Sequence, residues 1–281
     1  MKRPLRITAL LFLGLGLAAC SKVPVTGRVQ YNIIPDKVMM GLGKTAYSET
    51  ISDAKVIKSG DNTDLLEKVG KRISKVANRK DYDWKYKLIK DTDTINAWCM
   101  PGGKIAFYTG ILPVLKNEAG MGFVMGHEVG HAVAHHGAER MSQQLTVLGG
   151  MAGLYLYMDK KSDLSTEQKA IIVAAMGAGA EVGVLLPFSR KQESEADSIG
   201  VMFMAGAGYP PSESIKIWDR MDEASGGSSM PAFLSTHPST KDRKANLKDW
   251  LGRANKRYDR NKVGGSPLDT VWTDSSSSKN K

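Results

Sequence analysis

The stretch Gly126-His127-Glu128-Val129-Gly130-His131 decides how the rest of the sequence is interpreted, because it places two histidines four residues apart. On a helix this spacing puts both imidazoles on one face, a turn apart, so both can reach a single metal ion. The glutamate beside the first histidine completes the HExxH pattern, in which the histidines bind zinc and the glutamate moves protons. Such a short pattern also arises by chance, so the remaining sequence must supply a third ligand.

The sequence lacks the third histidine ligand that one large class of HExxH proteins has at a fixed distance after the second histidine. That class needs a glycine three residues after the second histidine and a histidine three residues further on. Those positions hold Ala134 and Gly137. His135 and His136 come too early along the helix, and we expect structural or solvent-facing roles for both.

An acidic residue on another helix is the better third ligand. Glu193 and Asp197 are four residues apart and therefore share one helix face. The sequence predicts that Glu193 completes a site for one Zn²⁺ per chain with His127 and His131, while Asp197 accepts a hydrogen bond from a ligand histidine. The alternative is a solvated acidic cluster paired with neighbouring basic side chains.

The N-terminus has the pattern of a secretory signal. Three basic residues precede the apolar run Ile7–Ala19, which is too short to span a bilayer. The run ends in Leu17-Ala18-Ala19-Cys20, which resembles a bacterial lipobox, so we expect Cys20 to be lipidated. An ordinary signal peptide with an accidental cysteine is the alternative. Ser21 favours the periplasmic face of the outer membrane, and Cys99 is then the only other thiol, so no internal disulfide can form.

The net charge of the protein limits which kinds of partner are expected. The formal net charge of +10 falls to +7 without the three basic residues of the leader, and much of the remainder lies in Lys241–Lys262. In a secreted protein this segment suits anionic lipid better than nucleic acid, which is not expected as a partner. A solvated helix face is the simplest explanation.

The pattern of apolar residues predicts an α+β fold that is predominantly α-helical, with a small β-sheet just before the HExxH helix. Expected helices are Pro35–Thr50, Thr63–Ala77, Asn117–His136 with a break at Gly137, Ser189–Gly206, Ser212–Ala224 and Lys241–Ala254; expected strands are Trp84–Lys90 and Lys104–Thr109. Two apolar runs, Leu145–Met158 and Ala170–Leu186, are expected to form a buried helical hairpin beside the site. A surface that faces a membrane or client is the alternative.

The expected domain organisation has four parts. Residues 1–19 form the signal peptide, residues 20–27 a tether, residues 28–262 a single metallopeptidase domain and residues 263–281 a flexible Ser-rich tail.

Four segments together resemble the gluzincin zinc metallopeptidases of the HtpX and CAAX prenyl protease family, over roughly Gly27 to Trp250. They are the HExxH segment, Glu193–Asp197, Asn96-Ala97 with Pro101-Gly102-Gly103, and His237-Pro238 with Arg243. The lipobox resembles the periplasmic lipoprotein branch of that family (LoiP-like). The resemblance implies a gluzincin-type fold and a zinc endopeptidase that clears misfolded or unassembled envelope proteins. A non-catalytic chaperone for outer-membrane proteins, acting with their assembly machinery, is the alternative.

The resemblance also implies roles for further residues. The segment Asn96–Ile105 would form the edge strand and loop against which substrate lies, and an extended client would add a strand near Ala106. The implied substrate-binding residues are Asn96, Ala97, Gly102, Gly103 and Ala106. Glu128 would be the general base, and His237 or Arg243 would donate to the oxyanion. The residue type of His237 and its place on the flexible segment Gly226–Pro238, rather than the resemblance, give the alternative that it is a latch that occupies the open zinc position.

Overall fold

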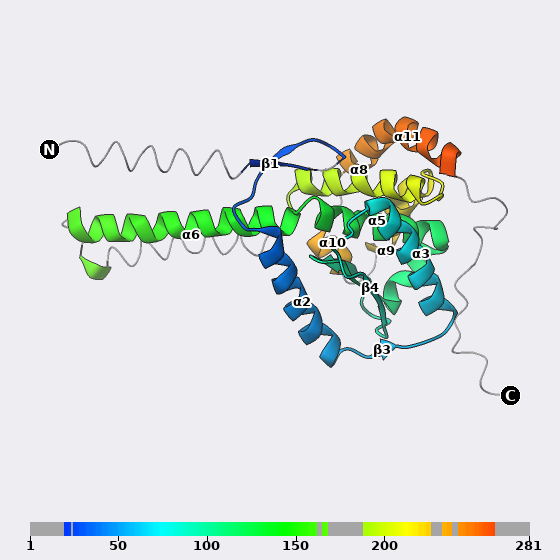
Figure 1. Ribbon diagram of the computed structural model, residues 1–281, viewed down its shortest axis with the longest axis horizontal. Coiled ribbons are helices and arrows are strands. Elements are labelled where there is room, and N and C mark those ends of the chain that lie inside the picture. Colours follow the sequence, from blue (N-terminus) through cyan, green and yellow to red (C-terminus); the bar gives the residue numbers. More distant parts are fainter. Residues whose placement is uncertain are drawn as a thin grey trace. The chain divides into compact units, whose positions relative to one another are not determined.

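The computed structural model describes residues 20–23, 25–161, 165–167, 188–225, 232–237 and 241–261 (Figure 1). The described chain is mostly helical with small sheets, which confirms the predicted α+β class. The predicted signal peptide, the second apolar run and the Ser-rich tail lie outside the described residues. The boundaries of the single domain at 28–262 stay a prediction.

The chain divides into two compact units, and each is described by itself. One unit comprises Met39–Ala134 with Pro187–Lys281 and contains the sheet and the HExxH helix. The other comprises Met1–Val38 with His135–Leu186. Helix α2 (Asp36–Asp53) begins in the second of these units and continues in the first.

A four-stranded sheet lies in the unit that carries the HExxH helix. Its strand order is β3 (Val56–Ile57), β4 (Lys85–Ile89), β6 (Lys104–Tyr108) and β5 (Ala97–Met100). Strands β4 and β6 are parallel, and the other neighbours are antiparallel. Both predicted strands are therefore confirmed, and the segment between them contains the edge strand β5. Ala106, expected at that edge, lies instead on the inner strand β6, because β5 pairs beside β6 and forms the edge; Ala106 is fully buried.

The HExxH helix α5 (Glu118–Val133) begins where the sequence predicts. Asn117 is its N-cap, and the Asn117 side-chain oxygen accepts a hydrogen bond from the Gly120 N–H at 2.8 Å. The helix ends at Val133 rather than near His136, because His135 adopts a left-handed φ of 56°. The predicted break at Gly137 is therefore misplaced, and Gly137 lies inside the next helix, α6 (His136–Lys161).

The other helices of this unit surround α5. Helix α8 (Arg190–Gly206) packs along α5, and α11 (Lys241–Asn261) packs along α8 (Figure 1). Helix α8 starts with a capping box between Ser189 and Gln192. Helices α3 (Asp61–Ala77) and α9 (Glu213–Ser225) also contact α5. Three short helices complete the unit, η1 (Thr109–Ile111), α4 (Leu112–Leu115) and α10 (Ala232–Thr236).

In the second unit, strands β1 (Cys20–Lys22) and β2 (Val29–Tyr31) form an antiparallel pair, and β2 contacts helix α6. Arg28 binds Glu139 of α6 with Nη1 at 2.7 Å and Nη2 at 2.8 Å. The first apolar run is part of α6, but Leu145, Val147 and Leu148 are about half exposed, so the predicted burial is wrong for these residues. No helix among the described residues is long and apolar enough to cross a membrane.

Glycines at the crossing of α5 and α8 let the two backbones approach closely. A Cβ added to Gly126 would lie 2.8 Å from the Gly200 carbonyl oxygen, and one added to Gly200 would lie 2.8 Å from the His127 nitrogen. Glycine in a helix interior costs roughly 1 kcal/mol relative to alanine, and the close approach explains why glycine stands here. This crossing brings the two segments that carry the candidate ligands together.

Replacing Gly200 with alanine is therefore expected to destabilise the fold by about 1 to 3 kcal/mol, because the new methyl group meets backbone atoms that must move apart. Gly41→Ala on α2 is the matched control, since nothing lies within 4 Å of its added Cβ. That control should be more stable than wild type by roughly 0.5 to 1 kcal/mol. Denaturant melts of both variants measure the difference, and equal midpoints would contradict the proposed close packing.

Candidate metal centre

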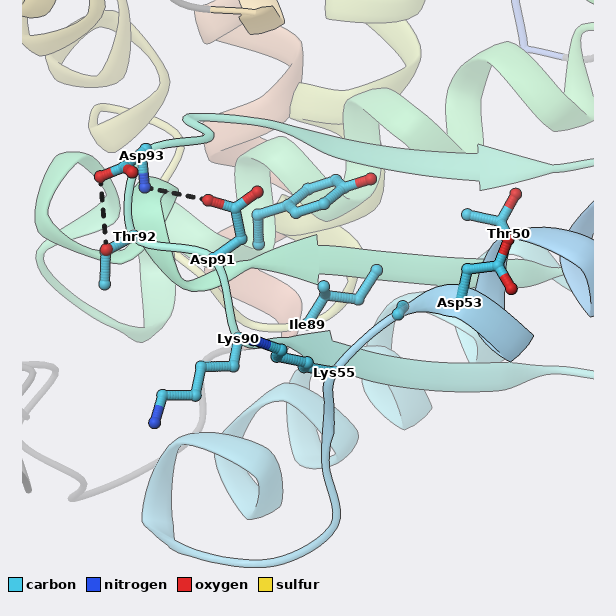
Figure 2. Close-up of a pocket in the computed structure, with 10 residues that line it drawn as sticks. Thr50, Asp53, Lys55, Ile89, Lys90, Asp91, Thr92 and Asp93 are labelled. Atoms are coloured by element: carbon cyan, nitrogen blue, oxygen red, sulfur yellow. Dashed lines mark hydrogen bonds between the residues drawn. The ribbon is translucent and has the colours of Figure 1, made fainter.

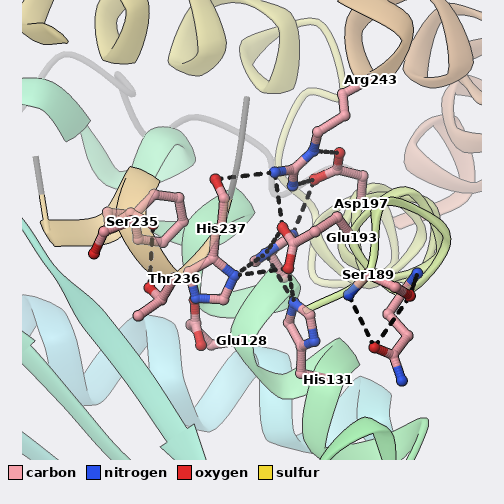
Figure 3. A network of polar contacts seen from close by, with 12 residues as sticks. Glu128, His131, Ser189, Glu193, Asp197, Ser235, Thr236, His237 and Arg243 are labelled. Atoms are coloured by element: carbon pink, nitrogen blue, oxygen red, sulfur yellow. Dashed lines mark hydrogen bonds and ion pairs between the residues drawn. The ribbon is translucent and has the colours of Figure 1, made fainter. Parts of the chain in front are cut away.

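Four side chains from three separate segments converge inside the larger unit. His127 and His131 come from α5, Glu193 from α8 and His237 from the residue after α10. One ligand atom from each lies within 4.8 Å of the others, and all four residues are buried (Figure 3). The predicted third ligand is thus brought to the HExxH pair, and so is His237.

The distances within this cluster are short. His127 Nε2 lies 3.1 Å from His131 Nε2 and 3.3 Å from His237 Nδ1. Glu193 Oε1 lies 3.3 Å from His131 Nε2 and 3.0 Å from His237 Nδ1. Imidazole nitrogens and a carboxylate oxygen form the donor set that suits Zn²⁺, so these residues fit the metal that the sequence predicts.

Asp197 contacts His127 on the side of its ring that faces away from the cluster. Its Oδ1 lies 2.9 Å from His127 Nδ1, and both side chains are buried. When Nδ1–H donates to this carboxylate, Nε2 carries no proton and its lone pair faces the cluster. The geometry therefore suits the role expected for Asp197.

Two carboxylates of the site have pKa values shifted in opposite directions, Glu193 downward and Glu128 upward. Burial would raise the pKa of Glu193, but the charges and hydrogen bonds of His131 and His237 hold it well below its usual range. Burial raises the pKa of Glu128, against the lowering effect of the His237 and His127 charges. Glu128 Oε1 is buried and accepts no hydrogen bond from any described residue. Glu128 is thus placed to take up a proton.

His237 is held in the cluster by aromatic packing and by its neighbours. Its ring stacks on Phe233 with centroids 4.6 Å apart, and the Phe233 N–H donates to the Ile95 carbonyl oxygen at 2.9 Å. Burial would lower the pKa of His237, but the carboxylates of Glu128 and Glu193 raise it. His237 Nε2 lies 3.4 Å from Glu128 Oε1, so this histidine contacts both a ligand and the base.

Arg243 lies on the side of the cluster that carries Asp197 (Figure 3). Its Nε and Nη2 donate to Asp197, and its Nη1 lies 2.7 Å from Glu193 Oε2. The sequence placed Arg243 among the oxyanion donors, but three of its nitrogens face protein carboxylates. His135 and His136 are outside the group of four, as expected; His135 pairs with Asp36, and His136 is fully buried.

The edge strand β5 runs beside Glu128. Tyr108 N donates to Asn96 O, so the alternate residues Ala97 and Cys99 direct their main-chain groups away from β6. The Cys99 N–H is hydrogen-bonded to Glu128. No strand in the described parts of the chain pairs with this edge. The main-chain groups of Ala97 and Cys99 therefore face the unpaired edge, while Asn96 faces β6. Ala97 is only 1% exposed, so of the expected substrate-binding residues it faces that edge but is buried.

Gly102 and Gly103, the other expected substrate-binding residues, form the turn between β5 and β6. Both have positive φ, 88° and 81°, which favours glycine. A Cβ on Gly103 would meet Trp84 at 2.8 Å, so this glycine also permits close packing. The turn geometry accounts for both glycines without a substrate.

Burial raises the pKa of the Cys99 thiol well above its usual value. The thiol therefore stays protonated, which favours the packing role over a redox role.

Sequence reasoning missed the aromatic side chains around the imidazoles. Phe188 lies 4.1 Å from the His131 ring, and Trp218 lies 6.4 Å from His127. Trp218 lies on the apolar face of α9. The spacing of apolar residues in that helix predicts that Trp218 is buried, but it does not predict which residues Trp218 contacts.

A hollow of about 620 Å³ lies elsewhere in the same unit, where α2, β4 and β6 end (Figure 2). Asp91 in its wall accepts hydrogen bonds from the Asp93 and Thr94 N–H groups and from the Thr94 hydroxyl. None of the four clustered donors lines this hollow. The chemistry of the metal cluster identifies the site better than the size of this hollow.

Known proteins resemble this chain over most of its length. Mitochondrial metalloendopeptidase OMA1 of Schizosaccharomyces pombe is 35% identical over 237 residues, covering 83% of this chain and 66% of that protein. The OMA1 protein of Saccharomyces cerevisiae is 35% identical over 188 residues, covering 63% and 49%. Beta-barrel assembly-enhancing protease of Escherichia coli is 28% identical over 201 residues, covering 69% and 39%. The chain thus spans less than two thirds of the length of each.

These relatives correct the predicted location. The predicted outer-membrane lipoprotein location is contradicted, because the OMA1 relatives of Schizosaccharomyces pombe and Saccharomyces cerevisiae, each 35% identical, are named as mitochondrial. Lipidation of Cys20 stays a prediction from the sequence. The relatives named above are OMA1 and beta-barrel assembly-enhancing proteins, so the narrower HtpX and LoiP resemblance is not shown.

The family model described as Peptidase family M48 matches residues 61–251. This span contains all four clustered donors, Glu128 and the edge strand β5. The chain belongs to peptidase family M48.

Proposed function

We propose that this protein is a zinc-dependent endopeptidase that cleaves extended segments of unfolded or unassembled proteins. The observation that carries the proposal is the convergence of His127, His131 and Glu193 within 4.8 Å, beside Glu128 and the free edge of β5. Family membership and the metalloendopeptidase names of the relatives support the reaction type.

His127, His131 and Glu193 would hold the zinc ion, which when bound supplies Lewis acidity and lowers the pKa of water. Glu128 takes the proton of the attacking water at its carboxylate and delivers it to the nitrogen of the leaving amine. Asp197 keeps the proton of His127 on Nδ1, so that Nε2 remains a ligand. The aromatic rings of Phe188, Trp218 and Phe233 around the imidazoles would limit the access of water to the ligands.

Substrate selection would depend on main-chain groups. An extended peptide that lies along the outer edge of β5, where Glu128 accepts the Cys99 N–H, would be recognised by main-chain groups with little regard to its side chains. This favours unfolded clients over folded ones. The name of the Escherichia coli relative, a beta-barrel assembly-enhancing protease, supports unassembled beta-barrel proteins as one class of client.

The purified protein is expected to cleave an unfolded protein such as casein and to leave a stably folded one intact. A strong zinc chelator should abolish cleavage, and added Zn²⁺ should restore it, because zinc supplies the Lewis acid. Cleavage rates with and without chelator, followed by gel and mass spectrometry, test this. Cleavage that persists in metal-free protein would contradict the proposal.

A further inference from the structure

Arg243 of α11 is a buried cation that touches two parts of the metal cluster at once. Its Nε lies 2.7 Å from Asp197 Oδ2 and its Nη2 lies 2.8 Å from Asp197 Oδ1, which is the two-pronged contact between a guanidinium and a carboxylate. Its Nη1 lies 2.7 Å from Glu193 Oε2 (Figure 3). One side chain therefore contacts the carboxylate behind His127 and also the ligand Glu193.

The position of this guanidinium is fixed from two further sides. Its central carbon lies 3.8 Å over the ring of Trp218, and Nη1 donates to the His237 carbonyl oxygen at 3.4 Å. Arg243 is only 2% exposed. The flat Trp218 ring beneath the planar guanidinium restricts its rotation. A rigid group therefore donates two hydrogen bonds to Asp197 and forms an ion pair with Glu193.

The charge of Arg243 also matters, because three carboxylates are buried together at this site. Glu128, Glu193 and Asp197 are each at most 3% exposed. Burying a carboxylate is costly unless a cation is paired with it. Arg243 places a permanent positive charge in contact with Asp197 and Glu193.

We propose that Arg243 is a positioning residue of the metal centre. Its guanidinium orients His127 through Asp197 and contacts Glu193 directly. One side chain therefore fixes the positions of two of the three ligands, His127 on α5 and Glu193 on α8. This assignment rests on the proposed metal-dependent function. It replaces the role of oxyanion donor that the sequence predicts for Arg243. The alternative is an ion pair that only joins α11 to α8 and leaves the ligands unaffected.

Arg243→Lys is the decisive variant, since it keeps the charge and removes the fork. A single ammonium group on a flexible stem cannot make the two-pronged contact with Asp197 and also hold Glu193. We expect Zn²⁺ affinity, measured by chelator competition, to fall roughly 10- to 100-fold, the range typical when groups behind metal ligands are changed. The visible spectrum of the Co²⁺-substituted protein should change, because it reports ligand geometry.

Arg220→Lys is the matched control. Arg220 of α9 is also largely buried, with Nη2 2.7 Å from Glu213 Oε1 and Nε donating to the Val114 carbonyl oxygen at 2.6 Å. It contacts none of the clustered donors in these interactions. We expect a comparable fall in thermal stability in this variant, with the Zn²⁺ affinity and Co²⁺ spectrum of wild type.

The outcomes separate the two proposals. If wild type binds neither ion, the proposed function fails. If wild type binds both and Arg243→Lys has the same Zn²⁺ affinity and Co²⁺ spectrum, the positioning role is wrong while the proposed function stands. Should Arg243→Lys not fold, Asp197→Asn breaks the link from Arg243 to His127 at its middle, and an unchanged Co²⁺ spectrum in that variant would equally overturn the inference.

Discussion

Replacing Glu128 with glutamine is expected to lower the rate of casein cleavage by about 10² to 10⁴, the usual contribution of a general acid and base. Glutamine has nearly the same shape and still accepts the Cys99 N–H hydrogen bond, but it cannot take the proton of the attacking water. The fold and the Zn²⁺ content should match wild type, because Glu128 is not among the four clustered donors. Initial rates, together with metal analysis of the same samples, measure both effects.

The same variant distinguishes the enzyme from the chaperone alternative. If Glu128→Gln prevents aggregation of an unfolded client as well as wild type does while cleaving nothing, client binding and cleavage are separate properties of this fold. If Glu128→Gln retains the full cleavage rate with bound zinc, the assignment of Glu128 as the base is wrong. Asp83, which binds Lys104 at the surface, provides a control carboxylate: Asp83→Asn should leave cleavage unchanged.

The local parts of the site follow from the sequence because short-range rules determine them. Asn117 and Ser189 start their helices as the capping rules predict, and these two starts set the rotation of α5 and α8. The four-residue spacing of Glu193 and Asp197 then places one at the cluster and the other behind His127. Spacing within a helix is enough for this step.

The long-range parts could not be predicted in the same way. The contact of Arg243 with Asp197 joins residues 46 positions apart, and no local pattern indicates that a basic residue in a basic helix is the buried one. The end of α5 at Val133 depends on His135 in a left-handed conformation, which a sequence rule assigns to glycine first. The apolar composition of Leu145–Met158 predicted burial, yet apolar residues often stay exposed on a folded surface, as Leu145 and Leu148 do.

Glu193→Ala is expected to weaken Zn²⁺ binding by more than about 100-fold, since it removes a direct ligand and ligand loss should exceed the effect of changing groups behind the ligands. His237→Ala is the matched comparison, because His237 is the fourth donor of the same cluster. Three protein ligands suffice for a catalytic zinc site, so we expect this variant to lose less than roughly tenfold in affinity. Chelator competition on both folded variants gives the ranking directly.

The cleavage rate of His237→Ala then separates its two proposed roles. A faster rate than wild type indicates that His237 occupies the open position of the metal and restrains the enzyme, as its contact of 3.0 Å with Glu193 suggests. A large loss of rate at unchanged zinc content indicates that His237 donates to the oxyanion. If His237→Ala instead loses as much zinc as Glu193→Ala, His237 is a required ligand, and the set of His127, His131 and Glu193 is incomplete.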